Sequence, residues 1–600
     1  MKNLAYLNKY FLRYKWRVLA GIVFVSASNY FRVLQPQVIR EALDLVVENL
    51  GFYRSVSDFP QAREALFDSL GQTLLLFGVL VLALALLMGV FMYLMRQTII
   101  VVSRLIEYDM RRDIYGQYQN LSRSFYKRNK TGDLMSRITE DVNKVRMYLG
   151  PAVLYGVNLV SVFIFVVYAM LQVSVELTLY SLAPLPILSI TIYYVSDLIN
   201  RRSTVIAQQI AKLNSTAQEV YSGIRVVKSY TQESSLARVF GEQTEDYREK
   251  SMGLARVDAA FFPIMIVLIG ASTIITVYVG GLKVISGAIS PGNVAEFVIY
   301  VNMLTWPVTA IGWIASIVQQ AEASQKRINE FLSEAPEIVS TASPSTAPLK
   351  GDIEFRNVTF TYPNGGATAI KELSFHLPAG RKMAVIGRTG SGKSTLVELL
   401  LRNFDPQTGE VRIDGVDIRD RDLANVRRRI GYVPQEVFLF SDTVAANIGF
   451  GCDTLPDQQE IERYAEYASV HNDILELPEG YKALVGERGV TLSGGQKQRV
   501  SLARALIKQP DIVVLDDSLS AVDTTTEQRI LGYLNGELAD KTAIIITHRI
   551  YALLNFDKII VLDEGRIVEQ GTHEELLAAG GYYAEQFERQ SLEAAEAIEN

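Results

Sequence analysis

A glycine-rich run near the middle of the chain has the composition and spacing of a phosphate-binding loop. The run GRTGSGKS, at residues 387–394, follows the aliphatic segment MAVI and precedes the helix-forming segment TLVELL. Glycines let backbone amides close around phosphates, and the N-terminus of the following helix adds a partial positive charge. The lysine would reach the β and γ phosphates, and the final serine would bind Mg²⁺. The residues expected to bind a nucleotide here are Gly387, Thr389, Gly390, Ser391, Gly392, Lys393, Ser394 and Thr395.

Two further aliphatic runs predict strands that end close to this loop. The run at 512–515 leads into Asp516 and Asp517, and the run at 543–546 is followed by Thr547 and His548. Acids at the carboxyl end of such a strand are placed to hold the Mg²⁺ that bridges nucleotide phosphates. We therefore expect Asp516 to bind the metal. A lone histidine after a strand is more often structural, so His548 needs a second argument.

The elements that position these side chains belong to the second half of the chain. Residues 349–590 alternate short aliphatic strands with helical segments, which predicts a cytosolic α/β P-loop nucleotide-binding domain. The run STASPSTAP ends at Pro348 and has the composition of a loop, so residues 336–348 are expected to be a linker. Residues 591–600 are expected to be a C-terminal tail.

The first half, residues 1–335, predicts an all-α membrane domain. The uncharged run at 74–95 is as long as the roughly 20 apolar residues that a helix needs to cross a bilayer. Similar runs lie at 151–175, 177–196, 259–282 and 297–320, and a weaker run begins at Val18 and is interrupted by Arg32. We expect six transmembrane helices. The alternative, buried helices of a soluble protein, would need a larger core than this half-chain could surround.

Lysine and arginine residues predict the orientation of these helices. They are concentrated before the first run and in the long stretches between the second and third runs and between the fourth and fifth runs. We expect those stretches, both termini and the nucleotide-binding domain to be cytoplasmic, in a multi-pass protein of the cell (inner or plasma) membrane. The long stretches lack linker composition and should continue the spanning helices into the cytoplasm.

Overall composition excludes several other classes of protein. Lysine and arginine number 59 against 65 aspartate and glutamate residues, so no basic field exists to attract nucleic acid, and no nucleic-acid partner is expected. Cys452 is the single cysteine, which excludes an intrachain disulfide and a cysteine-rich metal centre. The expected cofactors are ATP and Mg²⁺.

The segment TLSGGQKQR, taken with the motifs above, resembles the nucleotide-binding domain of an ATP-binding cassette (ABC) transporter, over Leu349 to about Gln590. The resemblance implies that Tyr362 stacks on adenine and that Gln435 senses Mg²⁺ and the attacking water. It implies that His548 contacts the γ phosphate and that Asp523 lies in a loop that crosses to a partner. It also implies that a signature segment binds the nucleotide of the partner, and this segment contains Ser493, Gly494, Gly495 and Gln496.

Six spans fused ahead of one cassette resemble the exporter branch of this family, which contains multidrug and lipid transporters. In this branch Gly132–Arg137 and Gly223–Lys228 match the coupling segments expected to dock on cassettes, and Gly486–Gly489 resembles an exporter-specific segment. Because the ATP sites of the family form between two cassettes, this chain is expected to be a half-transporter that dimerises. Import is the weaker interpretation.

One residue departs from the family pattern. The family usually places glutamate after the metal-binding aspartate, as the base that polarises water, and this chain has Asp517 there. The missing methylene withdraws the carboxylate by about 1.3 Å, and a misplacement on the order of 1 Å can cost about a hundredfold in rate. The site of this chain is thus expected to hydrolyse ATP slowly. The resemblance favours a heterodimer over a homodimer, because one subunit of many heterodimeric exporters carries such an aspartate. The intact His548 argues against such degeneracy, and backbone adjustment could let aspartate suffice.

The expected function is ATP-driven export by alternating access, with an ATP-gated pore or regulatory membrane ATPase as the alternative. The substrate is expected to be amphipathic or hydrophobic and drug-, lipid- or peptide-like, and membrane lipid is an expected partner. An intramembrane charge is a candidate for function, whereas tryptophans at span ends also anchor to headgroups and amides bridge helices. The candidate cavity residues are Arg32, Asn302, Trp306, Trp313, Gln319 and Gln320.

Overall fold

The computed structural model describes every residue except 1, 56–58, 342–343, 364–365, 367, 487–488, 490–491, 519–521, 523, 538–539, 549–555 and 600. The chain forms two compact units. The first consists of Met1–Gln119 and Gly132–Glu334, and the second of Asn120–Thr131 and Ala335–Asn600. The second unit thus takes a short segment from the first half of the sequence.

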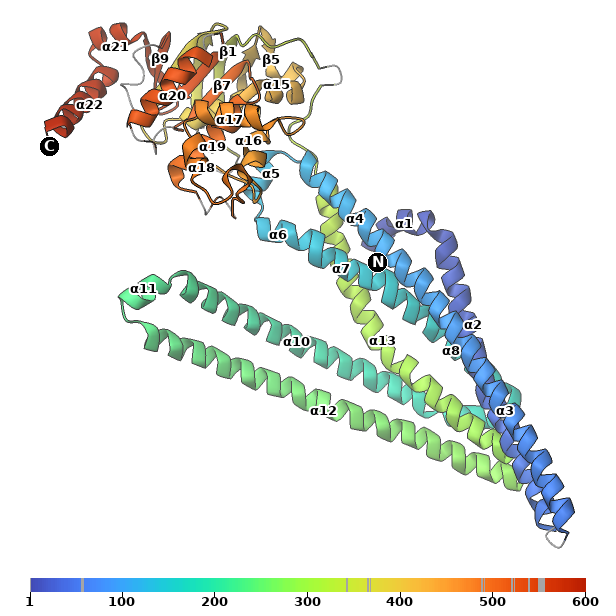
Figure 1. The fold of residues 1–600 in the computed structure, drawn as a ribbon. Coiled ribbons are helices and arrows are strands. Elements are labelled where there is room, and N and C mark those ends of the chain that lie inside the picture. The colour runs from blue at the N-terminus through green and yellow to red at the C-terminus, as the bar shows by residue number, and fades with distance from the viewer. Residues whose placement is uncertain are drawn as a thin grey trace. The chain divides into compact units, whose positions relative to one another are not determined.

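The described part of the first unit is helical (Figure 1). Its helices are α1 (Asn8–Arg13), α2 (Lys15–Ser55), α3 (Pro60–Met95), α4 (Val101–Asn120), α6 (Thr131–Ser136), α7 (Val142–Met147), α8 (Val153–Val173), α9 (Val175–Leu182), α10 (Pro184–Ser222), α11 (Ile224–Ser229), α12 (Glu233–Ile285) and α13 (Pro291–Leu332), with the short turns η1 (Asn3–Leu7), η2 (Arg96–Ile100), η3 (Arg137–Asp141) and η4 (Tyr148–Ala152) beside them.

Among the described residues, six helical segments are long and apolar enough to cross a membrane, which confirms the expected number of spans. They are Lys15–Ser55, Pro60–Asn120, Thr131–Val173, Val175–Ser222, Glu233–Ile285 and Pro291–Leu332. The longest has 61 residues, or about 90 Å of helix at 1.5 Å per residue, roughly three times the thickness of the hydrocarbon core. The helices therefore continue well beyond the bilayer.

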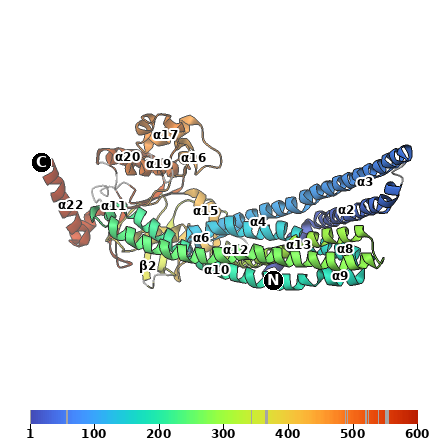
Figure 2. The same ribbon diagram turned by 90° about the horizontal axis from the view of Figure 1, so that it is seen from below.

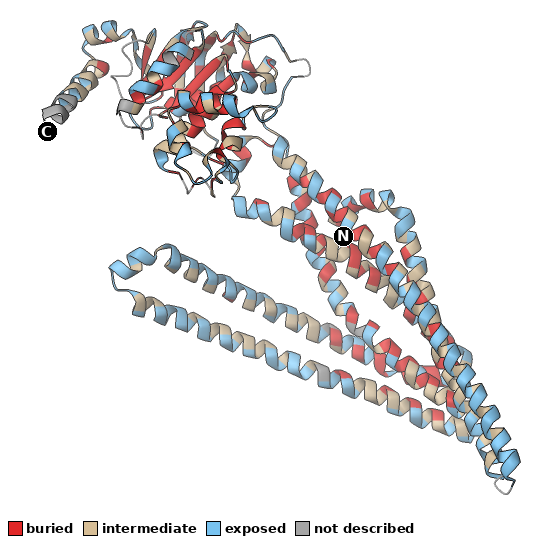
Figure 3. Cartoon of the chain, viewed as in Figure 1, coloured by how far each residue is buried: buried red, intermediate tan, exposed pale blue. Residues whose placement is uncertain are grey.

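Two of these helices form an extended hairpin within the unit. Helices α10 and α12 run side by side in two perpendicular views, and α11 joins them at the tip (Figures 1 and 2). Much of this hairpin is exposed or half-buried (Figure 3). A buried core lies where α2, α8, α9 and α13 meet parts of α10 and α12, and Val162, Val166 and Phe297 are fully enclosed in it. Ser290 begins α13 with a capping box that includes Asn293.

The second unit combines two sheets with surrounding helices. Its strands are β1 (Ile353–Thr361), β2 (Thr368–Leu377), β3 (Lys382–Gly387), β4 (Thr408–Ile413), β5 (Val416–Asp417), β6 (Ile430–Val433), β7 (Ile512–Asp516), β8 (Thr542–Ile546), β9 (Lys558–Asp563) and β10 (Arg566–Gly571). Its helices are α5 (Arg123–Arg128), α14 (Lys393–Leu400), α15 (Leu423–Arg429), α16 (Val444–Gly449), α17 (Gln458–Tyr467), α18 (His471–Leu475), α19 (Gly494–Leu506), α20 (Thr524–Glu537), α21 (His573–Ala579) and α22 (Tyr582–Glu599).

The larger sheet of this unit determines where its functional side chains meet. Its strand order is β10-β9-β3-β8-β7-β6, and every neighbouring pair from β9 to β6 is parallel. The strands β3, β7 and β8 are buried and nearly all aliphatic, as a parallel sheet covered on both faces requires. The smaller antiparallel sheet has the order β2-β1-β4-β5. The carboxyl ends of β3, β6, β7 and β8 therefore share one edge.

A short segment of the first half of the sequence belongs to the second unit. Residues 120–131, which contain α5, pack with the second unit, although we expected the first half up to residue 335 to form one membrane domain. The segment Gly132–Arg137 belongs to the first unit, and so does Gly223–Lys228. Helix α5 belongs to the second unit because its residues contact residues more than 200 positions later in the sequence. Local sequence patterns do not reveal such contacts.

Candidate ATP-binding site

A cavity of about 320 Å³ lies at the shared carboxyl edge of the larger sheet. Most of the predicted nucleotide and metal residues line it, although they come from distant parts of the sequence. The lining residues are Tyr362, Ala369, Thr389, Gly390, Gly392, Lys393, Ser394, Thr395, Gln435, Asp516, Asp517, Ile546 and His548. The sequence analysis did not identify Ala369 or Ile546, because apolar residues within strands carry no local signal for a binding site.

The loop after β3 has the backbone conformation that a phosphate cradle requires. Gly390 and Gly392 have φ values of +84° and +103°, in the left-handed region that glycine adopts without steric cost. A Cβ atom on Gly387 would lie 2.1 Å from the carbonyl oxygen of Leu562, so only glycine fits there. The Oγ atom of Ser391 is buried and has no hydrogen-bond partner among the described residues. The loop thus offers polar groups that a phosphate could satisfy.

The lysine of the loop is folded back over it. The Lys393 Nζ atom donates to the carbonyl oxygens of Gly387 at 2.8 Å and Arg388 at 2.9 Å. Burial lowers the pKa of Lys393, while the charges of Asp516 and Asp517 oppose that shift. The helix α14 begins at Lys393, so its N-terminal amides and the ammonium face the same cavity. The loop can therefore bind a polyanion.

The acid expected to bind metal is held beside the loop. Asp516 is the last residue of β7, and its carboxylate accepts a hydrogen bond from the Ser394 hydroxyl. Burial is the main cause that raises the pKa of Asp516. Among the described residues no group of three His, Cys, Asp or Glu side chains has the geometry to hold a metal ion by itself. The oxygen donors Ser394, Gln435 and Asp516 nevertheless line one cavity, and such a donor set fits Mg²⁺, which also takes ligands from phosphates.

Asp517 has a backbone conformation that restricts its side chain. Its φ is +49°, in the left-handed region that aspartate and asparagine enter more readily than other non-glycine residues. Its N–H donates to the carbonyl oxygen of Ile546 at 2.9 Å, which ties the end of β7 to β8. This hydrogen bond opposes the backbone shift that could make up for the missing methylene.

His548 reaches the same cavity from the end of β8. Burial and the nearby Lys393 charge lower its pKa, with Asp517 and Asp516 opposing the shift. The imidazole is therefore mainly neutral at pH 7 and can donate one hydrogen bond from a ring N–H. His548 lines the same cavity as Lys393 and Asp517. This position is the second argument, which the sequence lacked, for a functional role of His548.

The aromatic ring of Tyr362 also lines the cavity. The ring of Tyr362, just after β1, packs against Phe360 and Phe404, and its hydroxyl lies 3.2 Å from the Thr395 Oγ1 atom. The Lys127 ammonium of α5 lies 4.5 Å from the centroid of the same ring. Also in this unit, Arg123 of α5 pairs with the largely buried carboxylate of Glu398 on α14. The sequence alone did not identify Lys127, Arg123 or Glu398 as residues near the ATP site.

The signature segment does not line this cavity. Ser493 is the N-cap of α19 and forms a capping box with Gln496, while Gly494 has open space around it. None of the four signature residues, Ser493 to Gln496, lines the cavity. Asp523 and part of the exporter-specific segment, residues 487–488, lie outside the described residues.

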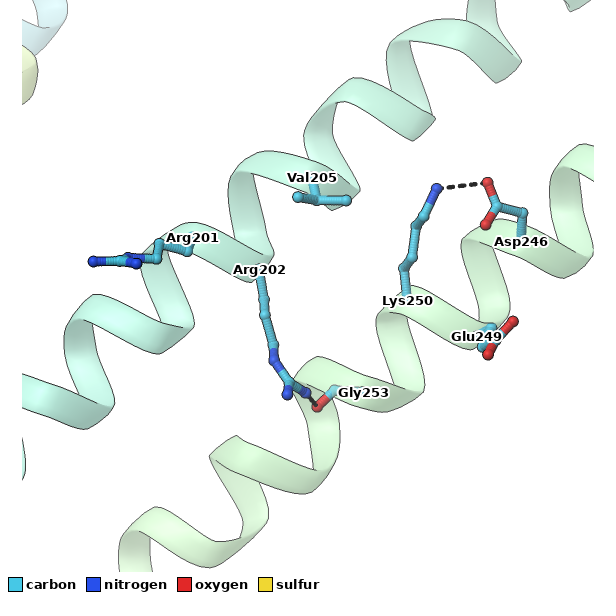
Figure 4. Close-up of a pocket in the computed structure, with 7 residues that line it drawn as sticks. All are labelled: Arg201, Arg202, Val205, Asp246, Glu249, Lys250 and Gly253. Atoms are coloured by element: carbon cyan, nitrogen blue, oxygen red, sulfur yellow. Dashed lines mark hydrogen bonds and ion pairs between the residues drawn. The ribbon is translucent and has the colours of Figure 1, made fainter.

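A larger cavity lies elsewhere, between α10 and α12 of the first unit (Figure 4). Its volume is about 520 Å³, and its cationic side chains have partners nearby. Lys250 pairs with Asp246, Arg201 pairs with Asp197, and Arg202 donates to the carbonyl oxygen of Gly253. Two of its three cations pair with carboxylates and the third with a main-chain oxygen, and none of the predicted nucleotide residues lines it, so size alone does not identify the nucleotide site.

Comparisons with known proteins agree with this geometry. The ABC transporter transmembrane region family matches residues 18–308, and the ABC transporter family matches residues 370–520. The chain is 36% identical to the multidrug resistance-like ATP-binding protein MdlA of Escherichia coli (strain K12), over 99% of this chain and 98% of that protein. It is 33% identical to an ATP-dependent lipid A-core flippase of Pseudomonas fluorescens (strain Pf0-1), over 84% of each.

A solved structure extends the similarity to the whole fold. The structure of a bacterial Atm1-family ABC exporter with ATP bound has a TM-score of 0.77 and 26% identity, and it covers 96% of this chain and 99% of that one. This chain therefore belongs to the ABC transporters, as a multi-pass membrane protein of the exporter type with an ATP-binding domain after its spanning helices.

Proposed function

We propose that this chain is one half of a dimeric transporter that uses ATP hydrolysis to export an amphipathic or hydrophobic substrate by alternating access. The observation that carries the proposal is that Lys393, Asp516, Asp517, Gln435 and His548 line one cavity, whereas the signature segment does not. A phosphate-binding half-site and a separate signature on one cassette call for a second cassette to complete each ATP site.

Each residue of the cavity has a separate task in the proposed hydrolysis. Loop amides and Lys393 bind the phosphates, and Tyr362 stacks on the base. Ser394, Asp516 and Gln435 would hold Mg²⁺, which neutralises charge on the phosphates when bound. Asp517 accepts a proton from the attacking water and orients it. The neutral imidazole of His548 donates its ring N–H to the γ phosphate, where negative charge is concentrated.

The connection from ATP to the spanning helices is proposed to run through α5. This helix follows α4 directly in the chain and packs within the nucleotide-binding unit. Its residues contact two parts of the ATP site: Lys127 lies over the Tyr362 ring, and Arg123 pairs with Glu398 of the helix that begins at Lys393. Movement of the cassette on ATP binding would thereby pull on the end of α4.

Asp517 supports a heterodimer in which the partner supplies the faster site. Its N–H bond to Ile546 and its left-handed backbone hold the short carboxylate in place. The intact Ser493–Gln496 segment of this chain would then complete the faster site of the partner. A homodimer with two equal sites is the alternative.

The substrate class is inferred from the first unit and from the names of relatives. A cavity of about 430 Å³ between α2 and α8 has a mainly apolar lining that includes Val160, Ile164 and Phe165. Of the candidate cavity residues, Trp306 and Trp313 are about half exposed, and both rings pack against Tyr155 of α8. Relatives named for multidrug resistance and lipid flipping fit a hydrophobic or amphipathic substrate.

Transport assays in reconstituted vesicles test the proposal. The complex should move a fluorescent amphipathic drug or lipid uphill with ATP, and Lys393→Ala should abolish both transport and ATP hydrolysis. Lys350→Ala, which removes an exposed lysine of the same unit, is the matched control and should keep both. Passive leak that ATP opens, without uphill transport, would instead support the pore. Normal hydrolysis in Lys393→Ala would refute the assigned site.

A further inference from the structure

The last helix of the chain is anchored on the strand that carries the phosphate-binding loop. Tyr583 of α22 is fully buried in a cluster with Ala384 and Ile386 of β3, and Phe587 packs against the same cluster. The Tyr583 hydroxyl is 2.6 Å from the Nδ1 atom of His573. The N-terminus of α22 is also fixed, because the amides of residues 582 and 583 donate to the Glu569 carboxylate.

The anchored face of α22 continues to the ATP site. Tyr583, Phe587 and Gln590 are spaced i, i+4 and i+7, so they lie on one side of the helix. The Nε2 atom of Gln590 donates to the main-chain oxygen of His548 at 2.7 Å. At the N-terminus of the helix, the Arg388 guanidinium of the phosphate-binding loop lies 5.7 Å from the centroid of the Tyr582 ring. Helix α22 therefore contacts both loops that face the phosphates.

We propose that Gln590 is a positioning residue for ATP hydrolysis, which holds His548 at the γ phosphate through the main chain. The inference rests on the proposed role of His548. The segment that carries His548 leaves β8 after Ile546, and its backbone position determines where the imidazole lies in the cavity. A donor on a helix packed against β3 fixes that position relative to the phosphate-binding loop. Sequence alone places Gln590 at the edge of an apparent tail, 42 positions away.

Substitutions of similar length separate the hydrogen bond from the packing of the helix. Gln590→Leu and Gln590→Glu both lose the donor, whereas Gln590→Lys keeps an N–H donor on a long side chain. Glu588→Ala alters an exposed residue of the same helix and is the matched control. The measurements are ATP-binding stoichiometry and single-turnover ATP hydrolysis by the full complex in lipid vesicles.

Loss of the donor should slow hydrolysis roughly tenfold while ATP stoichiometry and affinity stay unchanged, since a small displacement of a catalytic group is costly. Gln590→Lys should restore most of the rate, and Glu588→Ala should keep it. In a His548→Ala background Gln590→Leu should add no further loss, because both changes remove the same contribution.

Three results would overturn the inference. The first is equal rates for Gln590→Glu and Gln590→Lys, a comparison that remains informative if Gln590→Leu fails to fold. The second is a further tenfold loss in the His548→Ala background, which would indicate a general structural role. The third is a normal rate for His548→Ala, which would overturn the proposed role of His548 itself, whereas the first two leave that role intact.

Discussion

The ammonium of Lys127 lies 4.5 Å from the centre of the Tyr362 ring and 5.2 Å from that of Phe404. A residue from the first half of the sequence thus contacts the tyrosine proposed to stack on adenine. The quadrupole of the ring attracts the cation, an interaction of about 0.5–1 kcal/mol at partly exposed sites.

We expect Lys127→Met to weaken ATP binding about two- to fivefold, because the tyrosine loses the cation that holds its ring. Lys127→Arg should keep most of the affinity, since guanidinium also lies well over aromatic rings. Competition with a fluorescent ATP analogue measures the change. Unchanged affinity in Lys127→Met would mean that Tyr362 is held by Phe360 and Phe404 alone.

The ion pair between Arg123 and Glu398 should transmit the state of the ATP site. Arg123→Glu places a second acid beside a largely buried carboxylate, so transport should fall roughly tenfold or more. The double swap Arg123→Glu with Glu398→Arg should recover part of it. Arg128→Glu is the control, because its partner Glu337 is exposed and such pairs contribute roughly 0–1 kcal/mol. Additive losses in the double swap would argue against a direct pair.

The lowered pKa of His548 predicts how hydrolysis depends on pH. Because burial and Lys393 disfavour the imidazolium, the midpoint of its protonation should lie below the ordinary histidine pKa of about 6.5. Single-turnover hydrolysis should therefore be constant between about pH 7 and 8 and fall in more acidic solution. His548→Gln should be slower at every pH and lack that acidic decline. A decline that already begins above pH 7 would contradict the assigned shift.

Asp517→Glu should raise hydrolysis at the site of this chain if the short carboxylate limits the reaction, by up to about a hundredfold. Glutamate tolerates the φ of +49° less well than aspartate, so the gain is expected to be smaller than reach alone implies. Single-turnover ATPase of the co-purified complex measures it. One chain type with two equal, ordinary sites through Asp517 would show that aspartate is an adequate base.

The signature of this chain should act on the partner. Gly495→Asp places a carboxylate at the N-terminus of α19, where the phosphates of the nucleotide bound to the partner are expected, and should block the site of the partner by repulsion. ATP binding to the Lys393 loop of this chain should persist, which photo-crosslinking of each subunit would measure. Loss of labelling on this chain alone would contradict a shared interface.

The phosphate-binding loop, the spanning helices and the strand ends could be predicted from the sequence, because each depends on a short continuous segment. The run GRTGSGKS lies directly between a strand and a helix, so its phosphate-binding conformation depends on neighbouring residues. Five uncharged apolar runs and a weaker one interrupted by Arg32 predicted the six spans, since the bilayer sets the length of each one. Two aliphatic runs that lead into Asp516 and His548 predicted that both residues lie close to the phosphate-binding loop before any register was known.

Other features depend on contacts between distant segments, which no local pattern reports. The nucleotide-binding unit includes α5 because Arg123, Ser124 and Lys127 meet Glu398, Glu337 and Tyr362, more than 200 positions later. In the sequence Gln590 is only the last residue of the expected domain, until α22 packs against β3 and brings its amide to His548. The sequence by itself determined which residues can bind ATP and cross a membrane, because those properties belong to short segments. Tertiary packing alone decided which helix contacts the ATP site and what holds its histidine, because these depend on where distant surfaces meet.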